Sequence, residues 1–305
     1  MRPDSWHRTE DLDRFLARAG GFLRSRPALH TVPLTVTEGL RTGGARTYGD
    51  DPPVFGTLER DGAVRAAYFR TPPHLLYVTG LTPEEADSLA AHLSVLDGTL
   101  PGVNADRETA ASFATAWRTR TGGTATLRQR QRLYRLGTST PPEPLPPGRA
   151  RVAGERDRAL LVRWHTEFAE AIGGRALRDS GDWADARISY GGVTLWEAPD
   201  GTPVSMAGVT PTVAGQARVA PVYTPSHLRG RGYAGAVTAE VGRAVRDAGA
   251  QEVLLFTDLA NPTSNGLYQR IGYRPVADFA VYAFQDTRSP RDPQGPQDPQ
   301  GQSSS

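Results

Sequence analysis

The sequence predicts an α+β (mixed α/β) protein, in which helices flank a mixed, mostly antiparallel sheet and the chain forms two tandem domains. Three observations lead there: the length of 305 residues, strand-like and helix-like periodicities along both halves, and a proline-rich segment near the middle. The length suits two domains at ~150 residues each. We expect an N-terminal domain at 1–137, a linker at 138–148, a C-terminal domain at 149–285, and a disordered tail at 286–305 with almost no apolar residues.

The first domain is expected to alternate helices with short strands. Two apolar runs flank Asp61-Gly62, which is typical of a hairpin. Thr82-Pro83-Glu84-Glu85 combines a capping box with proline at the first helical position. The expected helices cover 10–23, 82–96 and 107–118, and the expected strands 54–58, 64–69, 75–78 and 124–136.

The second domain has similar elements in a similar order. Hairpin, strand and helix recur at 54–96 and again at 193–248, which suggests a degenerate repeat. The alternative is two unrelated mixed domains that share a common pattern. Neither half is a regular βαβ array, so the class is α+β. The expected strands cover 149–152, 193–197, 204–209, 217–224, 252–257 and 276–284, and the expected helices 155–172, 233–248 and 264–271.

Composition excludes several kinds of site. The chain has no cysteine, which removes disulfides, thiolate metal sites and a cysteine nucleophile. It has no lysine either, so all 35 basic residues are arginine. The six histidines show no H-x-x-x-H spacing, and we expect no metal.

With a net charge of +2 and interspersed charges, we expect no nucleic-acid partner. No apolar run approaches the ~18 residues of a membrane span, and no signal segment is visible, so we expect no membrane association and a cytoplasmic location.

The most informative segment is 217–235, where a strand leads through a glycine loop into a helix. Gly230 and Gly232 let successive backbone N–H groups converge on an anion, and the helix N-terminus adds a positive dipole. Arg229 and Arg231 add formal charge. This combination predicts a pyrophosphate site that needs no lysine.

Other interpretations of the same loop stay open. It could be an ordinary glycine-rich turn before a helix. Residues 230–235 also fit the dinucleotide pattern G-x-G-x-x-G, with Asp258 ending the next strand. Six residues separate Tyr223 from Gly230, and only one further helix and strand follow Asp258, which disfavours a doubly wound dinucleotide-binding sheet.

Two blocks of the second half resemble the GNAT acetyltransferase superfamily. The hexad Arg229-Gly230-Arg231-Gly232-Tyr233-Ala234 fits the acyl-CoA pattern Q/R-x-x-G-x-G/A at every fixed position. The block 255–273, which contains Asn-Pro-Thr-Ser-Asn and Tyr268, is similar to the family's second motif. The resemblance covers 149–285. Over 1–137 it rests on pattern alone and implies a degenerate GNAT-like or accessory domain.

The resemblance implies an N-acetyltransferase that uses acetyl-CoA as co-substrate and transfers the acetyl group directly to an amine in a ternary complex. Acetyl-CoA would enter a V-shaped opening between the strands that end at Thr224 and Asp258, and would pair with the first strand's edge. Its pyrophosphate would lie on the glycine loop. The implied cofactor-binding residues are Val222, Tyr223, Thr224, Arg229, Gly230, Arg231, Gly232, Tyr233, Ala234, Asn261 and Asn265.

Tyr268 matches the family's general acid, because a phenol with a pKa of ~10 is protonated at neutral pH and can protonate a leaving thiolate. The alternative is a core tyrosine. Asn261 also suits an N-cap before Pro262. The resemblance implies an oxyanion donor among the strand N–H groups near Val222. The general base is left open, with His165 a possible neighbour of the acceptor and His227 expected to face solvent; the carboxylate candidates are Glu167, Glu170, Glu197, Glu240 and Asp258.

The expected partner is a small-molecule amine or a peptide or protein amine, and the expected assembly is a monomer or homodimer. Two other functions are considered. One is a non-catalytic CoA-binding or sensing module that keeps the fold without the chemistry. The other is a dinucleotide-dependent oxidoreductase, on the G-x-G-x-x-G match alone.

Overall fold

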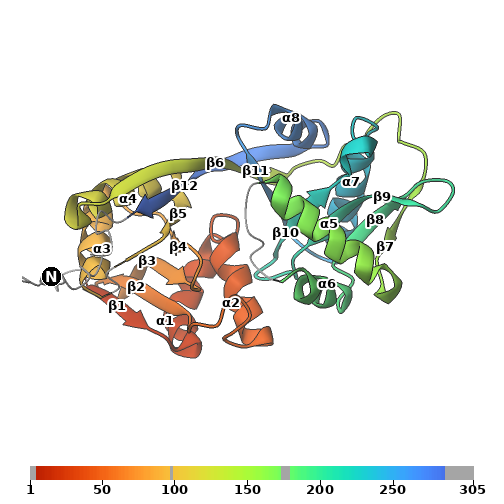
Figure 1. Ribbon diagram of the computed structural model, residues 1–305. Helices are drawn as coiled ribbons and strands as arrows, with labels where there is room; N and C mark the ends of the chain where they lie inside the picture. Colours follow the sequence, from red (N-terminus) through yellow and green to blue (C-terminus); the bar gives the residue numbers. More distant parts are fainter. Residues whose placement is uncertain (1–4, 97–98, 173–178, 286–305) are drawn as a thin grey trace, which may run out of the picture.

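The computed structural model describes residues 5–96, 99–172 and 179–285, and the tail expected at 286–305 lies outside these ranges. Each half of the described chain folds into the same series: strand, two helices, three strands, helix, strand, helix, strand (Figure 1). The predicted recurrence of hairpin, strand and helix is therefore confirmed and extends over the whole of each half. The first half contains β1 (Ser5–Thr9), α1 (Leu12–Ser25), α2 (Thr31–Gly43), β2 (Val54–Arg60), β3 (Ala63–Arg70), β4 (Leu76–Val78), α3 (Pro83–Leu96), β5 (Gly102–Asp106), α4 (Arg107–Thr121) and β6 (Thr124–Leu136).

The second half repeats this order after the proline-rich segment. Its first helix follows a short 3-10 turn at Glu155–Asp157, and another 3-10 turn, Ser226–Leu228, precedes its third helix. The elements are β7 (Arg149–Val152), α5 (Arg158–Ala171), α6 (Ser180–Ile188), β8 (Val193–Glu197), β9 (Pro203–Val209), β10 (Gln216–Tyr223), α7 (Tyr233–Asp247), β11 (Glu252–Asp258), α8 (Pro262–Arg270) and β12 (Tyr273–Gln285).

Four elements were not predicted: β1, α2, β5 and α6. Helix α2 shows why, because its sequence TVPLTVTEGLRTG is rich in β-branched residues and contains a proline, all poor helix formers. The hydroxyls of its buried threonines are satisfied within the helix. Thr35 Oγ1 donates to the Thr31 carbonyl oxygen at 2.8 Å, and Thr37 Oγ1 to that of Pro33 at 2.7 Å.

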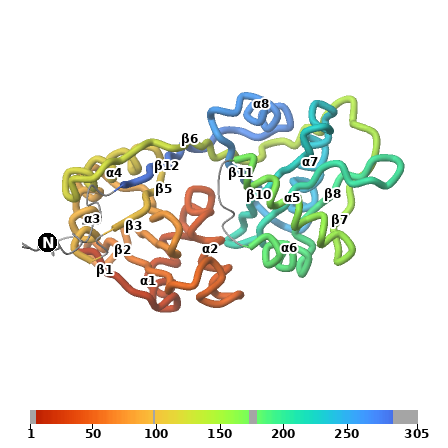
Figure 2. The backbone as a smooth tube through the Cα atoms, in the orientation of Figure 1, coloured from red at the N-terminus to blue at the C-terminus, as the bar shows by residue number. Residues whose placement is uncertain are grey.

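All twelve strands form one mixed, mostly antiparallel sheet in the order β1-β2-β3-β4-β5-β12-β6-β11-β10-β9-β8-β7. In the described chain, the parallel neighbours are β4 with β5 and β10 with β11. The two last strands are exchanged between the halves. Strand β6 lies between β12 and β11, and β12 lies between β5 and β6, so each half is completed by a strand of the other (Figure 2).

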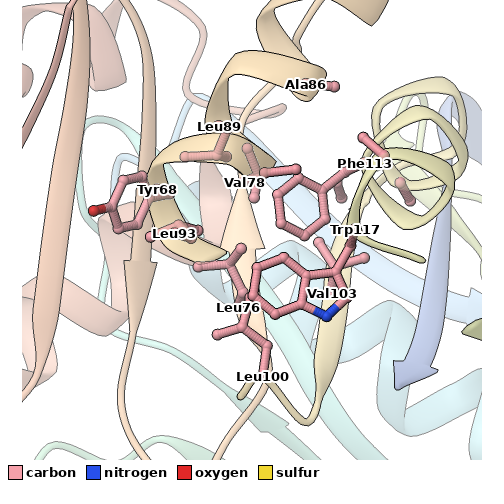
Figure 3. Close-up of a cluster of buried hydrophobic side chains, with 14 of the residues drawn as sticks. Tyr68, Leu76, Val78, Ala86, Leu89, Leu93, Leu100, Val103, Phe113 and Trp117 are labelled. Carbon is pink, nitrogen blue, oxygen red and sulfur yellow. The ribbon is translucent and has the colours of Figure 1, made fainter. Parts of the chain in front are cut away.

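The cores lie on both faces of this sheet. Helices α3 and α4 cover one face of the first half, where Phe113 and Trp117 pack against Leu76, Val78 and Val103 (Figure 3). Helices α7 and α8 cover the same face in the second half, and α1, α2, α5 and α6 cover the opposite face.

The linker expected at 138–148 contains no helix or strand and is fastened to the second half. The Thr140 N–H donates to the carbonyl oxygen of Ile271 at 3.2 Å, and Trp196 Nε1 donates to that of Pro147 at 3.2 Å. Pro146 is buried beside Gly232, at the start of α7. The segment therefore packs along the end of α8, the start of α7 and β8.

Candidate active site

The candidate site begins where β10 and β11 separate. These parallel strands pair only from Gln216 to Arg218 on one side and from Glu252 to Leu254 on the other, although β10 continues to Tyr223 and β11 to Asp258. Within the described residues, the β10 edge that faces β11 therefore has no strand partner from Val219 onward. A bulge between Val219 and Val222 shifts the register with β9 on the other side. This divergence agrees with the opening expected at Thr224 and Asp258.

The end of β10 is held in place by neighbouring side chains. Ser205 Oγ of β9 donates to the Tyr223 carbonyl oxygen at 3.0 Å and lies 2.8 Å from Thr224 Oγ1. Arg229 Nε donates to the Thr224 carbonyl oxygen at 3.0 Å. The strand end, β9 and the following loop are thereby tied together.

The glycine loop after β10 presents backbone N–H groups at the surface. Residues 229–232 are exposed, and Gly230 and Gly232 have φ values of +78° and +83°, in the left-handed region that favours glycine. Gly232 is the N-cap of α7 and supplies no side-chain cap. A Cβ at Gly230 would meet nothing within 4 Å. An exposed glycine loop that leads into a helix N-terminus is the kind of backbone arrangement that binds phosphate.

The corresponding position in the first half is closed. Between β4 and α3 lie only residues 79–82, and the predicted capping box is present. Glu85 Oε2 accepts from the Thr82 N–H at 2.9 Å, and Thr82 Oγ1 accepts from the Glu85 N–H at 3.3 Å. The buried carboxylate of Glu85 occupies the helix end that an anion would need.

Helix α8 is positioned by two asparagines. Asn261 is its N-cap, as predicted, and Asn261 Oδ1 accepts from the Ser264 N–H at 3.0 Å. Asn265 Nδ2 donates to the Asp258 carbonyl oxygen at 2.7 Å and to that of Asn261 at 2.8 Å, while its Oδ1 accepts from Tyr134 OH at 2.9 Å. Both amide hydrogens of Asn265 are engaged inside the protein, so its cofactor contact stays a prediction and its visible role is to fasten α8 to β11 and β6.

Tyr268 lies on α8 with its ring in the hydrophobic core beneath α7 and α8. Val222 packs against that core, and the ring of Tyr273 meets that of Tyr268 edge-on at 6.0 Å. Burial raises the pKa of Tyr268 to about 12. No group in the described part of the chain hydrogen-bonds its hydroxyl. Tyr268 is therefore fully protonated at neutral pH and keeps its proton for another acceptor.

Three of the five carboxylates considered as a base form ion pairs with arginine: Glu197, Glu240 and, at the longer distance of 3.9 Å from Arg163, Glu167. Hydrogen bonds from Arg151 lower the pKa of Glu197, and those from Arg243 lower the pKa of Glu240. Both are held as carboxylates by arginine. Asp258 is also engaged, since its Oδ1 accepts from the Ala260 N–H at 2.8 Å.

Glu167 lies beside the end of β10, where its Oε2 accepts from Tyr223 OH at 2.7 Å, whereas Glu170 is exposed on the same helix. His165 is buried, stacks on Trp183 at 4.3 Å, and has its pKa lowered to about 4, mainly by burial. His227 is exposed, as expected.

Several residues at the site were not found from the sequence. Tyr134 lies 131 positions before Asn265, and nothing in its own segment marks it as a partner of α8. Ser205 is one of many serines, and its role follows from the pairing of β9 with β10. Among the described residues, no cluster of three or more histidine, cysteine or acidic side chains is arranged to hold a metal ion. No helix in the described ranges is both long enough and apolar enough to cross a bilayer.

The fold is that of GNAT acetyltransferases in tandem. The chain is similar to a GCN5-related N-acetyltransferase from Sphaerobacter thermophilus (TM-score 0.62, 19% identity, covering 96% of this chain and 99% of that one). It is similar to a GNAT-family acetyltransferase from Colwellia psychrerythraea (TM-score 0.58, 13% identity, 93% and 100%). A tandem GNAT protein from the clavulanic acid biosynthesis pathway matches with a TM-score of 0.56, 12% identity, and 95% and 100% coverage.

One segment is also similar to a family at the sequence level. Residues 205–281 match the family described as FR47-like protein, and they contain the glycine loop, α7, β11 and α8. No curated protein sequence matches the chain. The protein thus has a tandem GNAT fold, and the FR47-like segment coincides with the half that carries the candidate site.

Proposed function

We propose that the protein is an acetyl-CoA-dependent N-acetyltransferase with its cofactor site in the second half. The observation that carries the proposal is the contrast between the halves. The second presents an uncapped helix end, a glycine loop and an unpaired strand edge together, while the first closes the corresponding helix end with Glu85. We further propose that the acetyl group passes directly from acetyl-CoA to an amine while both are bound in a ternary complex.

The residues present fit the cofactor. The edge of Val222 to Thr224 offers backbone groups to the amides of the pantetheine, in the manner of an added strand. The Arg229 N–H donates to the Ser226 carbonyl oxygen, so the N–H groups from Gly230 to Ala234 are those that suit the pyrophosphate, and both arginines of the loop add charge. Bound acetyl-CoA supplies an acyl thioester at the strand end.

The chain's own groups then serve the transfer. A backbone N–H near Val222 stabilises negative charge that develops on the carbonyl oxygen. Tyr268 holds a proton at its hydroxyl and donates it to the departing sulfur. Glu167, which already accepts a hydrogen bond at the end of β10, is the carboxylate best placed to receive a proton from the amine.

The proposal extends to the acceptor, the assembly, the location and the domains. The acceptor is a small-molecule amine or a peptide or protein amine, and the protein acts as a monomer or homodimer in the cytoplasm. Domains at 1–137 and 149–285 are joined by the linker at 138–148, although the exchange of β6 and β12 means that each completes the other's sheet.

Tyr268→Phe tests the proposal. We expect turnover to fall about 100-fold, because a general acid contributes roughly that much or more, with the acetyl-CoA dissociation constant changed less than twofold. Steady-state kinetics over a panel of amines and calorimetry provide the two values. Tyr273→Phe is the matched control, since that buried hydroxyl has no partner.

Unchanged turnover in Tyr268→Phe would remove the residue from the acid role. Acetyl-CoA binding without transfer to any amine, and without hydrolysis, would instead favour a non-catalytic CoA-binding module. NADH binding in place of acetyl-CoA would favour the oxidoreductase.

A further inference from the structure

A second feature lies on the opposite face of the sheet, at the base of the β10–β11 separation. Arg218 is the last β10 residue that pairs with β11. Its Nη1 donates to Thr31 Oγ1 of α2 at 3.2 Å, and within the described residues no carboxylate forms an ion pair with it. The side chain is set deep between the halves but keeps a partial exposure to solvent. Burial lowers the pKa of Arg218 to about 10, so the guanidinium is still charged at neutral pH.

Unsatisfied donors surround this guanidinium. Gln216 is fully buried; its Oε1 accepts from Thr31 Oγ1 at 2.7 Å, but its Nε2 has no hydrogen-bond partner among the described residues. The hydroxyl of Tyr77, which is 4% exposed on β4, also has no hydrogen-bond partner in that part of the chain, and Tyr77 interacts electrostatically with Arg218. Arg187 of α6 adds a second positive charge to the surroundings.

The arrangement needs an acceptor. A buried polar group without a partner costs free energy, and an arginine without a carboxylate costs more. Within the described residues, the amide of Gln216 and the phenol of Tyr77 have no acceptor, and the arginine has a threonine hydroxyl but no carboxylate. The group that would satisfy all three donors is an anion. Helix α2 of the first half contacts β10 of the second (Figure 1).

We propose that Arg218, Gln216 and Tyr77 form a subsite for a carboxylate or phosphate group of the acyl acceptor. The subsite rests on the proposed function, since the acetyl group would be delivered near Val222 on the same strand. The four residues from Arg218 to Val222 span at most about 13 Å, because the bulge between Val219 and Val222 shortens the strand. The acceptor is therefore an amine whose anionic group lies within about 13 Å of the nitrogen, no farther than the ends of an extended three- to four-residue peptide.

The test measures thermal unfolding in phosphate, acetate or chloride at equal ionic strength. We expect the wild-type melting temperature to rise by about 3 °C at ten times the dissociation constant of the bound anion. Arg218→Gln should lose the rise. Tyr77→Phe should reduce it without lowering the melting temperature in chloride, because the lost hydroxyl has no partner. Arg135→Gln, which removes an exposed arginine on β6, should keep the rise.

The melting temperatures in phosphate and in acetate, compared with that in chloride, identify the chemistry of the bound group. A rise in both anions indicates a site open to either group, and a rise in acetate alone or phosphate alone assigns a carboxylate or a phosphate. No rise in either anion, or a rise that survives Arg218→Gln unchanged, overturns the subsite; in the second case the anion binds elsewhere, as at the glycine loop. Tyr77→Phe keeps the proposal falsifiable if Arg218→Gln does not fold.

Acetyl-CoA protection is measured on the same proteins to separate the two proposals. If acetyl-CoA stabilises all of them and the anions do not, the subsite is wrong and the proposed function stands. If the anions stabilise the wild type through Arg218 and acetyl-CoA does not, the proposed function is wrong and the anion site needs another role.

Discussion

At the scale of single residues, Tyr134 links the two halves at the candidate active site. It belongs to β6 of the first half, yet its hydroxyl donates to Asn265 Oδ1 at 2.9 Å and accepts from Gln269 Nε2 at 3.0 Å, both on α8. The helix that carries Tyr268 is thus positioned by a strand of the other half. Tyr273 is equally buried in the same core, but its hydroxyl has no partner.

Tyr134→Phe is expected to destabilise the protein by about 1–2 kcal/mol, because two buried hydrogen bonds are lost and the Asn265 oxygen is left unsatisfied. Tyr273→Phe removes a hydroxyl from the same core and should cost much less. Urea unfolding of both variants gives the comparison. Equal losses of unfolding free energy in the two variants would mean that the hydrogen bonds of the Tyr134 hydroxyl contribute nothing to stability.

At the scale of elements, the outer edge of the sheet in the second half is fastened by one arginine. Arg151 of β7 donates to both Asp157 carboxylate oxygens, at 2.6 and 2.8 Å, and to Glu197 of β8. All three side chains are largely buried. Hydrogen bonds from Arg151 lower the pKa values of both carboxyls, so the network stabilises the fold when they are ionised.

This network predicts a pH dependence. Because the folded pKa values of Asp157 and Glu197 are lowered, their stabilisation is complete above the unfolded values near 4 and is lost as the pH falls below them. Arg151→Met should cost about 2–3 kcal/mol at pH 7, since it leaves the buried Asp157 without its ion pair and Glu197 with only the exposed Arg149, and less at pH 3. Unfolding experiments at several pH values measure how much unfolding free energy the variant loses. A loss that is constant from pH 3 to 7 would mean that the network does not depend on ionised carboxylates. Arg158→Met breaks an exposed ion pair with Asp185 and should lose less unfolding free energy than Arg151→Met.

Elements with strong local signals were predictable from sequence. The capping box at Thr82, the N-cap at Asn261 and the helix after Gly232 depend on residues within a few positions, and each is present. Helix α2 was missed because its stability comes from the packing of residues such as Leu34 and Leu40 against α1 and the sheet rather than from propensity. Tyr134 and Arg218 were missed because their roles depend on residues more than 130 positions away.

At the scale of the whole molecule, the linker and the repeat predict two tandem units, but not how they join. The exchange of β6 and β12 makes one continuous sheet, with the two long strands paired from Tyr273 with Leu136 to Gln285 with Thr124. Both strands carry mixed patterns that fit either neighbour, so sequence alone gives no reason to prefer the exchanged partner. The exchange places the first half against β10 and α8, where it contributes Tyr134 and Thr31 to the second.

On the proposed function, the second half binds acetyl-CoA and the first half does not, which calorimetric titration of the full chain with acetyl-CoA can decide. We expect one molecule bound per chain, with binding lost in Gly232→Val, which places a β-branched side chain at φ +83° in the phosphate-binding loop, and kept in Glu85→Gln. Two molecules per chain, no binding, or binding that persists in Gly232→Val would show that the second half alone is not the acetyl-CoA site.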